Sequence, residues 1–475
     1  MKTMAKHIVL LSVVVSSTLY ASGDNFSARL VGMGRTFTAI SRGLDAVGSN
    51  PANLALNDRD ATFTLSLAPL GLSVGSDFIN YGIYQEFFTG VPDPTPEDPN
   101  HRSSKVLSPD DKSKILGLFP GGISRTQAKI GMSPLGFSLQ LGDLGFAFVP
   151  SVQVASNIDI PEGFMKMFLT GFRDDPQGTS YNLDNTAAGL SIVASFNLSA
   201  AYKLPVELPE VTDIAVGIGV KYLLGIAYAT TDHYQSTIET NNVHQHTDEK
   251  GNTYYLPETI HANYDFLQFW AFDTSDYMPA GSGIGFDIGA SGVVMNMFRV
   301  GLSVTDIGSI TWDKGNHAIT GKGDLSIHGI DPKYGLLDTL STAFKGKTQD
   351  TTAFTYSLPT ALNIGVEIPM EKIIPEIPFR WRVAVDGHFG FNNVPGNSTI
   401  PQIALGTEIN PLWGWFPLRT GILIGGRQRF GWSAGFGLHL ANTFDLDIAT
   451  QSVALLANPN SFRTGSFVFG MRFRF

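Results

Sequence analysis

A regular alternation of bulky apolar residues with small or polar ones recurs along this chain, and it restricts the fold more than any other feature. Between 216 and 228 the bulky positions are Val216, Ile218, Val220, Tyr222, Leu224, Ile226 and Tyr228. The same pattern returns at 298–305, 362–368 and 432–440. Successive side chains of a strand point to opposite faces, so a period of two predicts strands with one apolar face. Several of these stretches reach the ~9–11 residues that a tilted strand needs to cross a bilayer.

A soluble β-sandwich and a transmembrane β-barrel would both show this alternation, but the composition favours the barrel. Hydrophobic residues make up 43% of the chain and charged residues only 16%, well below the share usual in soluble proteins. Beyond the N-terminus no apolar run approaches the ~18 residues of a membrane helix. The small-and-polar face is rich in glycine, which suits a crowded lumen. We therefore predict an all-β protein, a transmembrane antiparallel β-barrel.

The last stretch of the chain alternates most regularly. Its apolar positions are Phe467, Phe469, Met471, Phe473 and Phe475. It resembles the C-terminal insertion signal of bacterial outer-membrane proteins, which implies insertion by the barrel-assembly machinery into the lipid of the outer membrane. We expect this strand to close the barrel against the first one, because closure removes the free edges of a sheet. We count about fourteen strands, with short helices in the loops.

Residues 1–23 predict a cleaved signal peptide and export to the outer membrane of a Gram-negative cell. Lys2, Lys6 and His7 form a basic region, an apolar stretch follows, and we expect cleavage after Ala21 or Gly23. The apolar stretch is too short for a membrane anchor helix. The chain has no cysteine, which excludes a lipoprotein anchor, a disulfide framework and a thiolate metal site.

Residues 24–60 do not alternate, and we expect them to form an N-terminal hatch or plug ahead of a barrel of residues 61–475. The remaining expectations concern the barrel's strands, helices, turns and loops. They are a first strand near 62–69, a polar insert at 89–121 with a short helix capped by Ser108 and begun by Pro109, an amphipathic helix at 161–172, turns at Gly142-Asp143 and Ala441-Asn442, and loops or strand extensions at 230–282 and 313–352.

The stretch GMGRTFTAISRGLDAVGSNPANLAL at 32–56 resembles the N-terminal segment of the long-chain fatty-acid transporter (FadL-like) superfamily. That segment carries an aspartate-alanine pair and then Asn-Pro-Ala-Gly-Leu. This chain has Asp45-Ala46 and Asn50-Pro51-Ala52, with Asn53 in place of the glycine. Residues 285–315 and 357–368 look like segments of related barrels, among them the PorV-like barrels of type IX secretion.

The resemblance implies a barrel whose lumen is closed by a small N-terminal hatch. In transporter members a hydrophobic molecule is captured outside and released laterally through a kinked wall. The residues are compatible with this, because burying an apolar side chain inside the barrel is worth ~1.5–3 kcal/mol. A permanent plug and a gating hatch remain as alternatives, and Asn53 removes the glycine hinge that gating would use. The candidate ligand-binding or hatch residues are Phe37, Leu44, Asp45, Asn50, Pro51, Asn53 and Leu54.

Other motifs favour neither an enzyme nor a metal or nucleic-acid site. Gly-x-Ser-x-Gly occurs at 71–75 and 431–435, but the nucleophile elbow of hydrolases needs a strand-to-helix turn and both copies lie in alternating stretches. His244 and His246, with Asp248 and Glu249, are metal-binding residue types, yet two histidines in a polar loop are more often solvated. We predict no catalysis, no cofactor and no metal. The net charge of -10 argues against nucleic acid, whose phosphates require a basic surface.

Two classes of function remain. Transport of a small hydrophobic compound predicts an apolar pocket beneath the hatch and an opening in the wall. A PorV-like role, as a docking platform or shuttle for other proteins, predicts a filled lumen and ordered loops at 89–121 and 230–282. Transport is our expectation, and the sequence does not indicate a substrate.

Overall fold

The computed structural model describes residues 27–95, 98, 101–170, 179–206, 208–247, 253–273, 279–328, 344–411, 414–440, 443–454, 458 and 463–475. The predicted signal peptide, the predicted turn at Ala441-Asn442 and the residues Asp248 and Glu249 lie outside these ranges. Within them, no helix is long and apolar enough to span a membrane.

One antiparallel sheet of twenty strands forms the body of the molecule. The strands are β1 (Phe63–Ser76), β4 (Ile123–Met132), β5 (Leu135–Leu141), β6 (Leu144–Pro161), β7 (Thr179–Asn182), β8 (Ala187–Lys203), β9 (Val211–Thr247), β10 (Thr253–Phe272), β11 (Gly281–Val294), β12 (Phe298–Trp312), β13 (Asn316–His328), β14 (Lys347–Asp350), β15 (Phe354–Ser357), β16 (Ala361–Pro369), β17 (Arg380–Gly390), β18 (Gln402–Asn410), β19 (Leu418–Gly425), β20 (Arg429–Leu440), β21 (Phe444–Thr450) and β22 (Thr464–Arg474). Some of these strands are consecutive pieces of a single pass across the barrel wall, called here a crossing. β4 and β5, for example, pair one after the other along β1. The sheet therefore makes a barrel of fourteen crossings, and the predicted count is confirmed.

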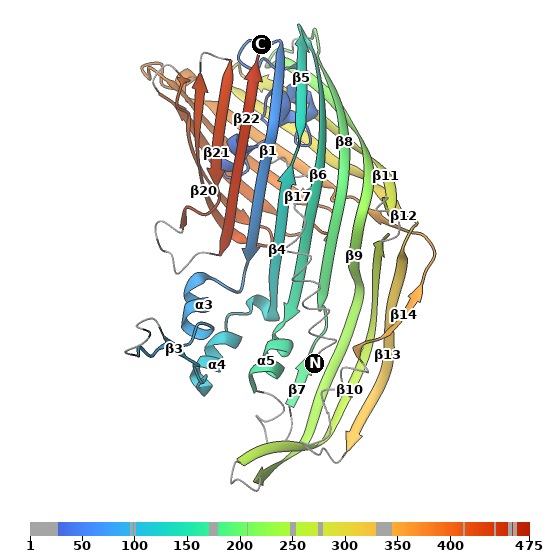
Figure 1. Ribbon diagram of the computed structural model, residues 1–475. Coiled ribbons are helices and arrows are strands. Elements are labelled where there is room, and N and C mark those ends of the chain that lie inside the picture. Colours follow the sequence, from blue (N-terminus) through green and yellow to red (C-terminus); the bar gives the residue numbers. More distant parts are fainter. Residues whose placement is uncertain are drawn as a thin grey trace.

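The barrel closes because its last strand pairs with its first. β22 runs antiparallel to β1 from the pair Thr64–Arg474 to the pair Gly75–Thr464, and the two lie side by side in Figure 1 as the red and blue arrows. Closure leaves no free edge between them. The predicted pairing of the final alternating stretch with the first strand is confirmed, although the first strand is longer than the expected 62–69.

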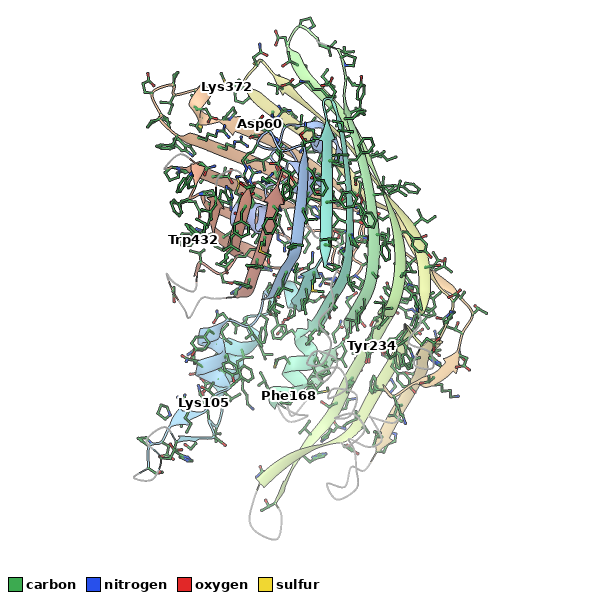
Figure 2. All side chains as sticks on the ribbon, turned by 45° about the horizontal axis from the view of Figure 1, so that its top comes forward. Asp60, Lys105, Phe168, Tyr234, Lys372 and Trp432 are labelled. Atoms are coloured by element: carbon green, nitrogen blue, oxygen red, sulfur yellow. The ribbon has the colours of Figure 1, made fainter. Side chains whose placement is uncertain are left out.

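The bulky residues of the alternating stretches face outward, which excludes the β-sandwich. In a sandwich these side chains would fill the core. Trp432 of β20, labelled in Figure 2, is 37% exposed, and bulky residues of other strands are exposed as well. Exposed apolar residues of the outer face include Leu72, Leu198, Ile218, Tyr222, Ile284, Ile403, Ile424 and Phe467. Such an outward apolar band is the surface that a transmembrane barrel presents to lipid.

The two ends of the barrel differ. One end carries short connections such as the Gly142-Asp143 turn, where Gly142 has a φ of 62° as predicted for a tight turn. The other end carries the helices α3 (Tyr81–Phe87), α4 (Pro109–Leu116) and α5 (Glu162–Thr170) and the small hairpin of β2 (Val91–Pro92) and β3 (Arg102–Ser103). Figure 1 shows this helix-bearing end at the bottom, where β9, β10 and β13 also extend beyond the other strands.

The predicted helices and extensions are present. α4 begins at Pro109, and the Ser108 hydroxyl accepts a hydrogen bond of 3.1 Å from the Asp111 amide. α5 covers residues 162–170 of the expected 161–172 helix, Pro161 ends β6, and residues 171–172 lie outside the described residues. Within the polar 230–282 stretch, β9 and β10 form a long hairpin that is paired out to Thr247 and Thr253.

Candidate functional site

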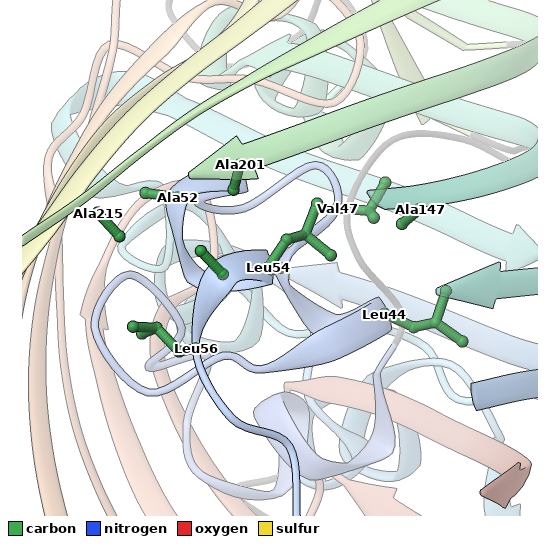
Figure 3. Close-up of a cluster of buried hydrophobic side chains, with 10 residues drawn as sticks. Leu44, Val47, Ala52, Leu54, Leu56, Ala147, Ala201 and Ala215 are labelled. Carbon is green, nitrogen blue, oxygen red and sulfur yellow. The ribbon is translucent and has the colours of Figure 1, made fainter. Parts of the chain in front are cut away.

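Residues 27–60, called here the inner segment, lie inside the barrel. They form the short helix α2 (Ala28–Gly32) and the 3-10 turns η1 (Gly43–Ala46) and η2 (Pro51–Ala55). Figure 3 shows their apolar side chains meeting small wall residues. Leu44, Val47, Leu54 and Leu56 pack in one buried cluster with wall alanines such as Ala147. The absence of alternation in this segment is explained by these turns, which bury side chains on every side.

Seven inward-facing glycines of the wall leave the space that the inner segment occupies. A Cβ added at any of them would come under 3.0 Å from an atom of the inner segment. At Gly406 and Gly421, on neighbouring strands, the obstructing atoms belong to the Met33 backbone. Because backbone cannot move aside as a side chain can, this contact requires glycine. This glycine ring comprises Gly145, Gly217, Gly289, Gly301, Gly365, Gly406 and Gly421.

Buried ion pairs also join the inner segment to the wall. Arg42 Nη2 lies 2.7 Å from Glu367 Oε2, and Arg29 donates to both carboxylate oxygens of Glu408 at 3.0 Å. Asp45 pairs with Arg472 in the same way. Breaking one partner of such a pair leaves a charge in low-dielectric surroundings, which costs about 3–5 kcal/mol. These ion pairs therefore hold the inner segment in place.

The Asn-Pro motif folds the inner segment onto itself. Asn50 and Asn53 both donate from Nδ2 to the Thr38 carbonyl oxygen, at 2.8 and 3.0 Å. Asn53 also donates to Ser41 Oγ at 2.9 Å, so the residue that replaces the family's glycine is a structural cross-link. Asp386 of β17 accepts from the backbone amides of Phe37 and Thr38, both at 2.7 Å.

A cavity of about 150 Å³ remains between the inner segment and one side of the wall. Leu44, Val47 and Gly48 form its boundary at the inner segment. Wall residues such as Val193 and Ser195 of β8 line it opposite. A second cavity of about 40 Å³, lined by Phe37 and Gly48 among others, lies next to it. A concave space lined by apolar groups and a few polar ones is the usual form of a small-molecule site.

One end of the larger cavity is aromatic. The rings of Tyr228 and Trp312 stack with centroids 5.1 Å apart, and Tyr356 lies 5.0 Å from Tyr228. The alternation predicted Tyr228 on the outward face, and this prediction is wrong. The β8–β9 pairing jumps from Ala227 to Gly225, so Ile226 is an extra residue that turns Tyr228 inward.

The opposite lining is polar, and in it one lysine pairs with two carboxylates. Lys221 Nζ lies 2.8 Å from Asp287 Oδ1 and 2.6 Å from Asp306 Oδ1, and its side chain is almost fully buried. Ser195 and Asn197 line the cavity beside this group. A ligand here would meet hydroxyl and amide groups as well as hydrocarbon.

Three prolines interrupt the wall where the cavity reaches it. Pro69 lies in β1, and Pro134 lies in the gap between β4 and β5. Pro150 of β6 is opposite that gap, because the pairing of β6 with β4 ends at Val152 and its pairing with β5 begins at Phe148. Proline has no amide hydrogen and weakens a ladder. The gap is bridged by Ser133, whose amide donates to Pro69 O at 3.2 Å and whose Oγ donates to Pro150 O at 2.6 Å.

A connecting loop covers the cavity from the helix-bearing end. Residues 391–401, between β17 and β18, fold inward, and Val394 and Pro395 line the larger cavity. Asn157 of β6 donates from Nδ2 to the Val394 carbonyl oxygen at 3.1 Å. The cavity is thus bounded by this loop, the inner segment and the wall.

Sequence reasoning found only part of this site. All seven candidate residues lie in the inner segment, but only Leu44 lines the larger cavity and only Phe37 the smaller; Asp45, Asn50, Pro51, Asn53 and Leu54 are buried in packing or hydrogen bonds. The aromatic group, the proline gap and the 391–401 loop were missed. The prolines Pro69, Pro134 and Pro150 were a visible signal, because proline is rare within strands.

The remaining sequence motifs lie away from the cavity or form no site. Ser73 and Ser433, the centres of the Gly-x-Ser-x-Gly motifs, lie within β1 and β20 and not at strand-to-helix turns. His244 Nε2 is 3.8 Å from Glu258 Oε2. Among the described residues, no group of three histidine, cysteine or acidic side chains is arranged to hold a metal ion. The residues Phe467, Phe469, Met471 and Phe473 lie in β22, and Phe475 ends the chain beside it.

Comparisons with known proteins return one family and a set of barrels. The model of a family described as "Family of unknown function (DUF5723)" matches residues 51–446. No curated protein matches. Solved structures similar to this chain include the toluene transporter TodX of P. putida, with 12% identity, a TM-score of 0.44 and coverage of 96% of this chain and 99% of the other. A Pseudomonas aeruginosa FadL homologue has 10% identity, a TM-score of 0.47 and coverage of 96% and 100%; it comes from the family that the 32–56 stretch resembles.

Proposed function

The chain belongs to the DUF5723 family of unknown function, and we propose that it is an outer-membrane barrel that transports a small hydrophobic compound. The observation that carries this proposal is the cavity itself, which lies between the inner segment and the proline gap of the wall. A barrel that served only as a scaffold would need no such space, since interiors otherwise pack to the density of organic crystals.

The proposed path enters at the helix-bearing end, which faces the outside. α5 lies at this end and presents Phe168, 77% exposed and labelled in Figure 2, and Phe164, 40% exposed. These rings suit the capture of an apolar molecule. The molecule then passes the 391–401 loop into the cavity. The glycine ring and the buried ion pairs keep the inner segment in place as a permanent plug, which blocks the lumen. The molecule therefore leaves through the wall, at Ser133.

Ligand extraction tests the proposal. We expect the detergent-purified barrel to retain a hydrophobic compound that mass spectrometry identifies. Replacing Ser195 by phenylalanine should fill the cavity and reduce the bound compound at least about tenfold, equivalent to ~1.4 kcal/mol, whereas Ser195→Ala should retain it. Equal recovery from the Phe variant, or bulk lipid alone from every protein, would rule out this cavity as the binding site.

A second variant tests the exit. Ser133→Leu places a larger side chain in the gap between Pro69 and Pro150, so we expect the compound still to bind while its uptake by intact cells slows. The Ser195→Phe variant should lose binding and uptake together. If Ser133→Leu left uptake at the wild-type rate, release through this part of the wall would be contradicted.

A docking role is the second candidate, and one observation favours it. The β9–β10 hairpin stays paired far beyond the barrel, out to Thr247 and Thr253, and Ile238 and Ile260 give it a buried core with Tyr181. An ordered projection of this kind suits contact with another protein. Loss of a co-purifying protein, with uptake unchanged, on shortening this hairpin would support the docking role.

A further inference from the structure

The described residues of the 77–122 stretch form a lobe, called here the rim lobe, at the helix-bearing end. Its core packs Ile83 and Phe87 of α3 against Ile115 of α4, and the rings of Phe78 and Phe119 lie 4.5 Å apart. Met165 and Leu169 of α5 pack on the same core. α5 directly follows β6 of the barrel wall, and it packs on the buried face of α3. That face of α3 is therefore turned toward the barrel.

The opposite face of α3 carries an exposed aromatic stripe. Tyr81, Tyr84 and Phe88 follow one another at helical spacing and are 44%, 49% and 44% exposed. The stripe continues the lipid-facing surface of β1, where Val74 is 46% exposed only a few residues earlier, through the exposed Ile79. In Figure 1 the lobe lies below the lower ends of β20, β21 and β22, at one side of the barrel and not beneath its centre.

An excess of positive charge lies where the rim lobe joins the barrel. Arg125 Nη1 and Arg429 Nε lie 3.8 and 3.9 Å from Asp77 Oδ2, and Arg463 donates to the Asp77 carbonyl oxygen at 2.9 Å. Two guanidinium groups therefore share the Asp77 carboxylate, and a third binds the backbone of the same residue. Asp77 is buried, whereas the Arg429 side chain is 52% exposed, so the uncompensated charge faces the surroundings.

We propose that the rim lobe is a membrane-contact element that rests on the outer leaflet beside the barrel. The aromatic stripe lies at the boundary between headgroups and acyl chains, where tyrosine and other aromatic residues are favoured. The arginines at Asp77 bind the anionic, phosphate-bearing headgroups of that leaflet. Continuity with the lipid-facing band and the positive charge at the same rim both indicate lipid as the occupant. This role is independent of what the cavity binds.

Site-directed spin labelling tests the position of the stripe, because the chain has no cysteine and a single substitution gives one label. Tyr84→Cys is the test site. Leu198→Cys, on the outer face of β8, is the lipid reference, and Val106→Cys, 90% exposed on the rim lobe, is the water reference. In phosphatidylcholine vesicles that also contain phosphatidylglycerol, we expect the label at 84 to be accessible to oxygen and shielded from a nickel chelate, as at 198. Accessibility equal to that at 106 would overturn the proposal.

A charge variant tests the headgroup contact. Arg429→Gln should lower the shielding of the label at 84 in the phosphatidylglycerol vesicles to the level found with phosphatidylcholine alone. Lys114→Gln, which removes the same charge from α4 of the same lobe, should leave it unchanged. Equal shielding in both vesicle types, or no effect of Arg429→Gln, would overturn the headgroup assignment. If the label at 84 were shielded only in native membranes and in neither vesicle type, the lipid proposal would be overturned, and a protein partner would be the occupant of the stripe.

Discussion

Alanine at both Gly406 and Gly421 is expected to displace the inner segment and make the barrel conduct ions. Both added methyl groups would point at the Met33 backbone, closer than 3.0 Å, and neither can be relieved by a side-chain rotation. Overpacking of this kind costs about 1–3 kcal/mol per site, which the inner segment would avoid by moving away from the wall. The measurement is single-channel conductance in planar bilayers, together with the free energy of unfolding in urea.

The matched control places two alanines where the wall has room. Gly470 has no atom within 4 Å of an added Cβ, and Gly431 has only ordinary contacts. Gly431→Ala with Gly470→Ala should therefore remain closed and as stable as the wild type. If the Gly406→Ala, Gly421→Ala barrel stayed closed and stable, the inner segment would have to adapt to the added methyl groups. That result would contradict a permanent plug and favour a gating hatch.

Arg419→Met is expected to lower the free energy of unfolding by about 3–5 kcal/mol, the usual effect of breaking a buried ion pair. The Arg419 side chain is fully buried, and it donates to Glu408 at 2.7 Å and to Asp447 at 2.5 Å. Glu408 also pairs with Arg29 of the inner segment. The four charges balance, so removal of one arginine leaves an uncompensated carboxylate inside the barrel. Urea titration followed by tryptophan fluorescence measures the loss.

The double variant Arg419→Met, Asp447→Asn separates charge balance from packing. Glu408 keeps Arg29, the amide introduced by Asp447→Asn keeps a polar contact for His439, and the buried charges balance again. We expect this variant to be more stable than Arg419→Met alone, despite carrying one more substitution. A double variant that is less stable would mean that the hydrogen bonds of Asp447, and not the charge, stabilise this part of the barrel.

Much of the fold was predictable because the signal is local. Alternation in β12, β16, β20 and β22 reports which side chains face lipid, and Ser108 and Pro109 indicated the start of the short helix α4. The site was harder to predict. Asn50 and Asn53 stood out as a motif, but they hold the inner segment together and do not line the cavity. Tyr228 was assigned to the wrong face because a single bulge residue, Ile226, has no signature in an alternating pattern.

The sequence by itself determined the class of fold, the number of crossings and most of the strand faces, since a period of two is visible in neighbouring residues. Only the tertiary structure decided which glycines meet the inner segment and where a cavity remains. Arg42 and Glu367 are 325 residues apart along the chain, and Pro69, Pro134 and Pro150 meet only after β1, β4, β5 and β6 have paired. Contacts between such distant segments depend on register and packing, which no local pattern records.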